Sequence, residues 1–298
     1  MLGCINAHII TEGCRNGIEL WYHTIIPVLL PFILLTGLII NSINKIQISS
    51  FCAYIIIFSI GMLCGFPTGT MIISHFYEKG VINRQRAQIL LPMCNNVSSM
   101  FLYGYIYTEY MKNYMNFFTL ILLIYAPQIS ITAICLLFMY IRRQTCSNTH
   151  DFLHHSTSCC ASQISAARES VYNSDSISDK AHTGIIDKSI HSITVIGVYM
   201  VIFSIARALI CLYFPGTYAP IFTSFMEISQ GLPQIAEADI REGTKTALMI
   251  SLSSFGGLSA IFQSHDMIKS SGLSFHKYII GKSTYSLLCY IIAYIVMR

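Results

Sequence analysis

The feature that most constrains this chain is a series of long apolar segments with almost no charge inside them. The clearest segment runs from Phe117 to Ile141 and stops at Arg142 and Arg143. A helix of about 20 apolar residues crosses a hydrocarbon layer about 30 Å thick, and its backbone polar groups are satisfied internally. Because 54% of the residues are hydrophobic and 11% are charged, the pattern extends to the whole chain. The sequence therefore predicts an all-α polytopic membrane protein whose main partner is the lipid bilayer.

The apolar segments fall into two groups separated by a polar stretch. We expect about seven hydrophobic segments in two related halves, an N-terminal membrane half at residues 1–141 and a C-terminal membrane half at residues 190–298. Between them, residues 142–189 are rich in Ser, Thr, His, Asn and Asp and show no sustained helical or strand period. This composition is typical of a disordered loop.

Basic residues suggest which side of the membrane this loop faces. Three groups lie near segment ends: Lys79, Arg84 and Arg86; Arg142 and Arg143; and Arg241 and Lys245. Because cytoplasmic loops carry an excess of Lys and Arg, we expect all three groups, and the central loop, on the cytoplasmic side. The formal net charge of +4 is scattered rather than gathered in one stripe, so nucleic acid is not an expected partner.

Catalytic and metal-binding patterns are missing from the sequence. No HExxH, GxSxG, P-loop or GxGxxG pattern is present, so we expect neither an enzyme nor a cofactor. The loop contains Cys146, His150, His154, His155, Cys159 and Cys160, which are residue types that zinc accepts. Their spacing lacks the paired Cys and His ligands of closed zinc sites, so no metal site is predicted.

Two glycine-bounded stretches predict a repeat. Gly65 to Gly80 and Gly257 to Gly272 have equal lengths, follow apolar segments and carry a basic residue before the closing glycine. In transporters, broken segments at corresponding positions of two halves form the site near the midplane. We therefore expect re-entrant hairpins at Gly65 and Gly257. Alternatively, the glycines only let helices pack closely.

The expected hairpins carry groups that could bind a solute. These candidate solute-binding residues are Pro67, Thr68, Gly69, Gly257, Ser259 and Gln263. Asn95 and Asn96, in the segment Ile89 to Ile106, offer amides that could bind the same solute or join helices.

Glu227 is the most informative ionisable residue, because an acid inside a membrane segment costs about 2.5–3.5 kcal/mol on insertion scales. One interpretation gives Glu227 a role in solute binding or coupling. The other makes Glu227 and Arg207 a structural pair that fixes the packing of neighbouring helices.

Six short motifs occur in a fixed order along the chain. They are Glu12-Gly-x-x-x-Gly17-x-x-Leu20-Trp21, Pro27-x-Leu-Leu-Pro31-Phe32, Gly65-Phe-Pro67-x-Gly69, Cys94-Asn95-Asn96, Phe225-Met-Glu227-Ile-Ser-x-Gly231-Leu232 and Phe255-Gly256-Gly257-Leu258-Ser259. In this order the chain resembles the YlbJ-type sporulation integral membrane proteins, which carry the nucleoside-recognition or Gate domain. The resemblance covers nearly the whole chain except the central loop.

The resemblance implies a function. It implies a multi-pass protein of the cell membrane that is needed for spore cortex formation, with a distant likeness to concentrative nucleoside transporters. We expect a transporter-like permease for an unknown small polar solute. The alternative is a non-transporting scaffold for other sporulation membrane proteins, and a homo-oligomer fits either hypothesis.

Overall fold

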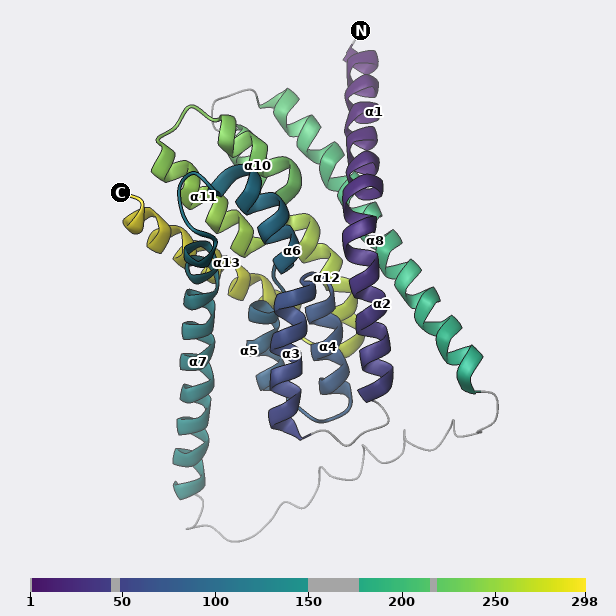
Figure 1. Cartoon of the computed structure of the whole chain (residues 1–298), viewed down its shortest axis with the longest axis vertical. Helices are drawn as coiled ribbons and strands as arrows, with labels where there is room; N and C mark the ends of the chain where they lie inside the picture. The colour runs from purple at the N-terminus through teal and green to yellow at the C-terminus, as the bar shows by residue number, and fades with distance from the viewer. Residues whose placement is uncertain (1, 44–48, 150–176, 215–218) are drawn as a thin grey trace.

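The chain folds into helices packed around two interrupted regions (Figure 1). The structure is a computed structural model that describes residues 2–43, 49–149, 177–214 and 219–298. These described residues form helices and turns and contain no strand. The predicted all-α class is therefore confirmed.

The elements follow one another in two series. The first is α1 (Leu2–Leu20), the π-helical turn η1 (Trp21–Ile25), α2 (Ile26–Ile43), α3 (Ser50–Cys64), α4 (Thr68–Glu78), α5 (Arg84–Cys94), α6 (Ser99–Phe101), the π-helical stretch η2 (Leu102–Met111) and α7 (Phe117–Thr149). The second is α8 (Ile177–Tyr213), α9 (Ala219–Ser224), α10 (Ile228–Glu237), α11 (Glu242–Phe255), α12 (Gly257–Ser271) and α13 (Phe275–Val296).

Five helical stretches in the described ranges are long and apolar enough to cross a membrane. They are Ala7–Ile43, Phe117–Arg142, Ser189–Tyr213, Glu242–Ser271 and Phe275–Val296. Many of their large apolar side chains are exposed on the outside of the protein, as lipid contact requires. The molecule is therefore a multi-pass membrane protein.

The boundaries of the polar central stretch differ from the prediction. Helix α7 continues to Thr149 and α8 begins at Ile177, so both ends of the predicted loop 142–189 are helical. The polar side chains there gave no amphipathic period, yet each end extends a long apolar helix whose backbone hydrogen bonding is already established. Residues 150–176 lie outside the described residues.

In the first series, a pair of packed helices precedes an interrupted helix. The Ser49 hydroxyl caps α3 by accepting from the Cys52 N–H, and Gly65, with φ of 72°, ends it. Only glycine adopts this φ readily, and it lets the chain reverse so that α4 packs beside α3. After α5 the backbone leaves the helical conformation at Asn95 and becomes helical again at Ser99.

In the second series, the packed pair is α9 and α10, joined by residues 225–227. Helices α11 and α12 follow, interrupted at Gly256, whose φ is 89°. They form one candidate span of 30 residues and do not fold back on each other, which differs from the hairpin predicted at Gly257. When the elements of the two series are matched in order, the break at Gly65 between α3 and α4 corresponds to the turn between α9 and α10. The break at Asn95 after α5 corresponds to Gly256 between α11 and α12. The equal glycine spacing in the sequence therefore matched segments that hold different places in the two series.

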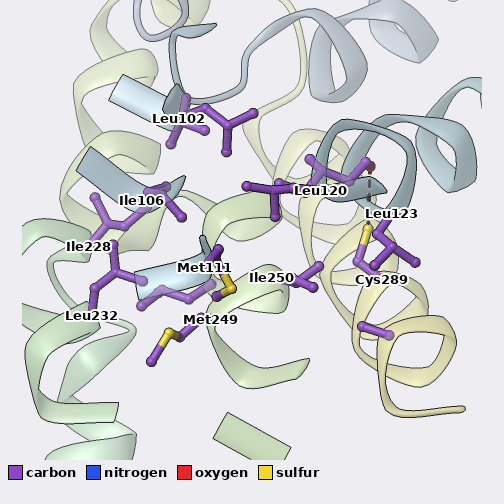
Figure 2. Close-up of a cluster of buried hydrophobic side chains, with 14 of the residues drawn as sticks. Leu102, Ile106, Met111, Leu120, Leu123, Ile228, Leu232, Met249, Ile250 and Cys289 are labelled. Atoms are coloured by element: carbon purple, nitrogen blue, oxygen red, sulfur yellow. Dashed lines mark hydrogen bonds between the residues drawn. The ribbon is translucent and has the colours of Figure 1, made fainter. Parts of the chain in front are cut away.

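The two series share a buried apolar core, part of which Figure 2 shows. Leu102 and Ile106 of η2 pack among Ile228 and Leu232 of α10, with Ile250 of α11 nearby. All five side chains are at most 7% exposed. Since lipid is itself apolar, close packing rather than water exclusion holds such helices together.

Helices α1 and α8, the first of each series, lie side by side (Figure 1). Gly13 and Gly17 form a G-x-x-x-G pattern, and a Cβ at Gly17 would lie only 2.8 Å from Val201 Cα. Further along, the Trp21 indole N–H donates to the Ile193 carbonyl at 2.9 Å. The missing Cβ of Gly197 makes room for the Trp21 ring. Small residues thus let the two series approach closely.

The expectation that all three basic groups face one side is wrong. The Arg84 guanidinium donates to the Gly272 carbonyl, just after the C-terminal end of α12. Arg241 precedes α11, at the other end of the span Glu242–Ser271, and donates to the Arg298 carbonyl. The basic residues therefore lie at both ends of this span, because Gly256 interrupts it without reversing its direction.

Candidate functional site

Four interruptions of helical structure meet inside the molecule. They are residues 65–67 and 95–98 in the first series, and residues 225–227 and Gly256 in the second. In the first series, the Phe66 N–H donates to the Asn96 carbonyl at 2.8 Å. In the second, the Leu258 N–H donates to the Phe225 carbonyl at 2.8 Å and the Ser259 N–H to the Met226 carbonyl at 3.0 Å. Each pair of breaks thereby satisfies backbone groups that the helices leave unpaired, which buried backbone requires.

Glycines make this close approach possible in the first series. A Cβ at Gly61 or Gly69 would overlap the Cys94 carbonyl oxygen. A Cβ at Gly65 would lie 2.5 Å from the Ser98 nitrogen. The backbones of α3, α4 and α5 are therefore in direct contact at the breaks.

Phe66 connects the two series. A Cβ at Gly256 would overlap the Phe66 ring, so this ring lies directly on the backbone of the second break. Phe66 itself is 7% exposed.

A cavity of about 70 Å³ lies where the breaks meet. Its polar and aromatic lining comes from Thr24, Phe66, Ser98, Phe101, Glu227, Ser229, Ser259 and Gln263. Its outer, apolar wall comes from Ile25, Val28 and Leu29 of η1 and α2 and from Ile196 and Met200 of α8. This mixture of an apolar wall and a few polar groups is typical of small-molecule sites.

Glu227 is the acidic group in this lining and is 2% exposed. Its side chain caps α10 by accepting from the Gln230 N–H at 2.8 Å. The Gln230 side chain in turn donates to Ser204 Oγ of α8 at 2.8 Å. The predicted pairing of Arg207 with Glu227 stays a prediction.

The predicted solute-binding residues divide into three groups. Glu227, Ser259 and Gln263 line the cavity. Pro67, Thr68, Gly69 and Gly257 belong to the same breaks and lie within a few residues of the lining, and the Thr68 hydroxyl donates to the Gly65 carbonyl at 2.7 Å. Asn95 and Asn96 do not line the cavity and instead bind other side chains.

The Asn95 and Asn96 amides organise a buried polar network. Asn95 Nδ2 donates to Ser264 Oγ at 2.6 Å and to the Tyr278 hydroxyl at 2.7 Å. Asn96 Nδ2 donates to the Met93 carbonyl at 2.6 Å and to Gln128 Oε1 at 2.8 Å. The network therefore ties the first series to α12 and α13, in line with the interpretation that these amides join helices.

Lys282 completes this network and was missed by the sequence analysis. It lies within α13, in a candidate membrane span, and is 0% exposed. Its ammonium group donates to the Asn95 carbonyl at 3.0 Å and to Asn96 Oδ1 at 2.8 Å, and lies 5.1 Å from the centre of the Phe66 ring. The signal was a lysine inside the apolar run from Tyr278 to Met297.

The part of the chain that the structure describes contains no group of three or more His, Cys, Asp or Glu side chains that could hold a metal ion. His150 to Cys160 of the central loop lie outside the described residues. Comparisons with protein-family models, curated proteins and solved structures find no match to this chain.

Proposed function

We propose that this chain is a transporter-like permease that binds a small polar solute in the cavity between the helix breaks. The observation that carries the proposal is the meeting of four breaks around a cavity lined by Glu227, Ser259 and Gln263. Broken backbone at membrane depth occurs where protein or a water-filled cavity satisfies it, and it is typical of solute sites in transporters.

The proposal assigns a membrane role to the packed helix pairs. The pairs α3–α4 and α9–α10 are re-entrant hairpins that enter the membrane without crossing it. Together with the five candidate spans and the interrupted helix from α5 to η2, they make eight hydrophobic segments in two related halves. The shared order of packed pair, interrupted helix and long apolar helix supports this assignment.

The resemblance to the YlbJ-type proteins adds a cellular setting to the proposal. On that resemblance, the permease acts in the cell membrane during formation of the spore cortex. The six ordered motifs support this setting, and four of them supply residues at the breaks.

Glu227→Gln in purified protein reconstituted into vesicles tests the proposal. Wild-type vesicles are first assayed for uptake of radiolabelled nucleosides, amino acids and sugars, and the solute taken up is then used for the variant. The glutamine oxygen can still accept from the Gln230 N–H, so α10 keeps its cap and thermal unfolding in detergent stays close to that of the wild type. Uptake should fall at least about tenfold, because a charge-assisted contact to the solute is lost.

Glu237→Gln is the matched control, because Glu237 is an exposed acid on the same helix. It should leave uptake unchanged. Full uptake by the folded Glu227→Gln variant contradicts the proposed site. The scaffold hypothesis is favoured by two results together. Vesicles that contain the wild-type protein take up none of these solutes, and a strain that carries Glu227→Gln sporulates fully.

A further inference from the structure

Lys282 is a buried cation that does not contribute to the proposed solute site. It does not line the cavity, and in the described ranges no Asp or Glu forms a salt bridge with it. A buried charge is costly unless polar groups surround it. Its surroundings therefore explain why a lysine stands here.

The ammonium group lies in a set of ligands that suits a monovalent cation. Asn95 ends α5 with φ of −112° and ψ of 73°, so its carbonyl points away from the helical hydrogen-bond pattern and accepts from Lys282. The C-terminal end of a helix also carries partial negative charge. The Phe66 ring adds a cation–π contact at 5.1 Å.

The Asn96 oxygen is held ready for a cation by its neighbours. Asn96 Nδ2 donates to the Met93 carbonyl and to Gln128 Oε1, which leaves Oδ1 facing Lys282. Gln128 is itself fixed because its Nε2 donates to Ser254 Oγ at 3.1 Å. Three helices thus position one acceptor atom.

Close packing brings the lysine to this site. A Cβ at Gly281 would lie 2.5 Å from Pro92 Cγ, so α13 and α5 touch one residue before Lys282. The four-carbon stem then reaches from α13 to the end of α5.

Unwound backbone carbonyls and the C-terminal ends of half-helices are the groups that bind coupling cations in transporters with broken helices. From this geometry we infer that the Lys282 ammonium group is a tethered cation that fills a built monovalent-cation site at the α5 break. The protein therefore binds its solute without added Na⁺ or K⁺. This consequence for coupling rests on the proposed function, whereas the cation site does not.

Thermal unfolding of the full-length protein in detergent tests the cation site without any solute. The midpoint of the wild type should be the same in NaCl, KCl, methylammonium chloride and choline chloride at equal ionic strength. Lys282→Ala removes the donor to the Asn95 main-chain carbonyl and to Asn96 Oδ1. The unfolding midpoint of this variant in choline chloride should therefore be roughly 10 °C lower than that of the wild type. Methylammonium, which fits the vacated site, should restore about half of that loss, as expected for a ligand that binds only the folded state.

Two further variants separate charge from packing. Lys282→Met keeps the stem but not the charge, and should be destabilised without any response to methylammonium. Lys277→Ala, an exposed lysine on the same helix, should match the wild type in all four salts.

The inference is overturned if Lys282→Met is as stable as the wild type, or if methylammonium does not raise the midpoint of Lys282→Ala. It is also overturned if the wild type has a higher midpoint in NaCl or KCl than in choline chloride. This last comparison needs only the wild type, so it tests the inference even if Lys282→Ala yields no folded protein. Failure of uptake in the vesicle assay overturns the permease and leaves these thermal results standing, so the two proposals fail separately.

Discussion

In each of the two pairs of helix breaks, backbone hydrogen bonds join one break to the other, but the side chains around them differ. In the first pair, Phe66 and Asn96 share a backbone hydrogen bond, and amides and Lys282 fill the space beside it. In the second pair, Leu258 bonds to Phe225 and the neighbouring side chains line a cavity. Both pairs contribute to the cavity lining, but the polar side chains Asn95 and Asn96 of the first pair are taken up by the network, whereas Glu227, Ser259 and Gln263 beside the second pair line the cavity.

This difference separates stability from binding. Side chains beside the first pair are bonded on several sides, so changing them should damage folding. Side chains beside the second pair face the cavity, so changing them should damage solute binding more than folding. Three substitutions test this division, in addition to those at Glu227 and Lys282.

The largest effect is expected from Gly69→Val in the first pair. The new side chain would overlap the Cys94 carbonyl, which is backbone and cannot move aside. Folded protein should be destabilised by more than about 3 kcal/mol, measured as loss of the monodisperse peak in size-exclusion chromatography and of the thermal transition. Gly104→Ala, where a Cβ would meet nothing within 4 Å, is the control and should be tolerated. A well-folded Gly69→Val protein would show that the breaks are not in close contact.

An intermediate effect is expected from Asn96→Ala. This change removes an acceptor from Lys282 and a donor from the Met93 carbonyl and Gln128. Because buried partners lose their hydrogen bonds, the free energy of unfolding should fall by about 2–4 kcal/mol in thermal or denaturant unfolding. Asn113→Ala, at an exposed asparagine in a turn, should change it little. Equal effects of the two variants would contradict the buried polar network.

The smallest effect on stability is expected from Gln263→Leu in the cavity lining. The side chain is 6% exposed and faces the cavity rather than the Lys282 network. Leucine preserves most of its volume, so the free energy of unfolding should change by less than about 1 kcal/mol. Uptake should weaken, because a polar group is removed from the cavity. If stability falls as far as in Asn96→Ala, the division between the two regions is wrong.

The sequence predicted the class of fold and named three residues that line the cavity. Long apolar segments predict membrane helices because the bilayer leaves few alternatives. Glu227 stood out as an acid inside an apolar segment, and Ser259 and Gln263 stood out as polar groups beside a predicted break. The pairing of the breaks could not be predicted from glycine spacing, because local spacing does not show whether a chain reverses, as after Gly65, or continues, as after Gly256.

Lys282 and Phe66 were missed for different physical reasons. Lys282 stands in a segment apolar enough to qualify as a span in spite of its charge, so the segment average concealed it. Phe66 is one aromatic residue among many apolar ones, and only the folded chain places its ring against Gly256 and the Lys282 ammonium group. Contacts between residues that are 190 and 216 positions apart, as these are, have no local signature.

The contact between Trp21 and α8 gives the protein a native optical reporter. The chain has one tryptophan, and its indole N–H is bonded to Ile193 while its ring covers Gly197. Four residues further along, Ile25 lines the cavity. Tryptophan fluorescence, excited at a wavelength that tyrosine does not absorb, therefore reports on one contact between the first helices of the two series, beside the cavity. Emission recorded during solute titration or salt exchange will report whether that contact changes, with no label attached and no residue replaced.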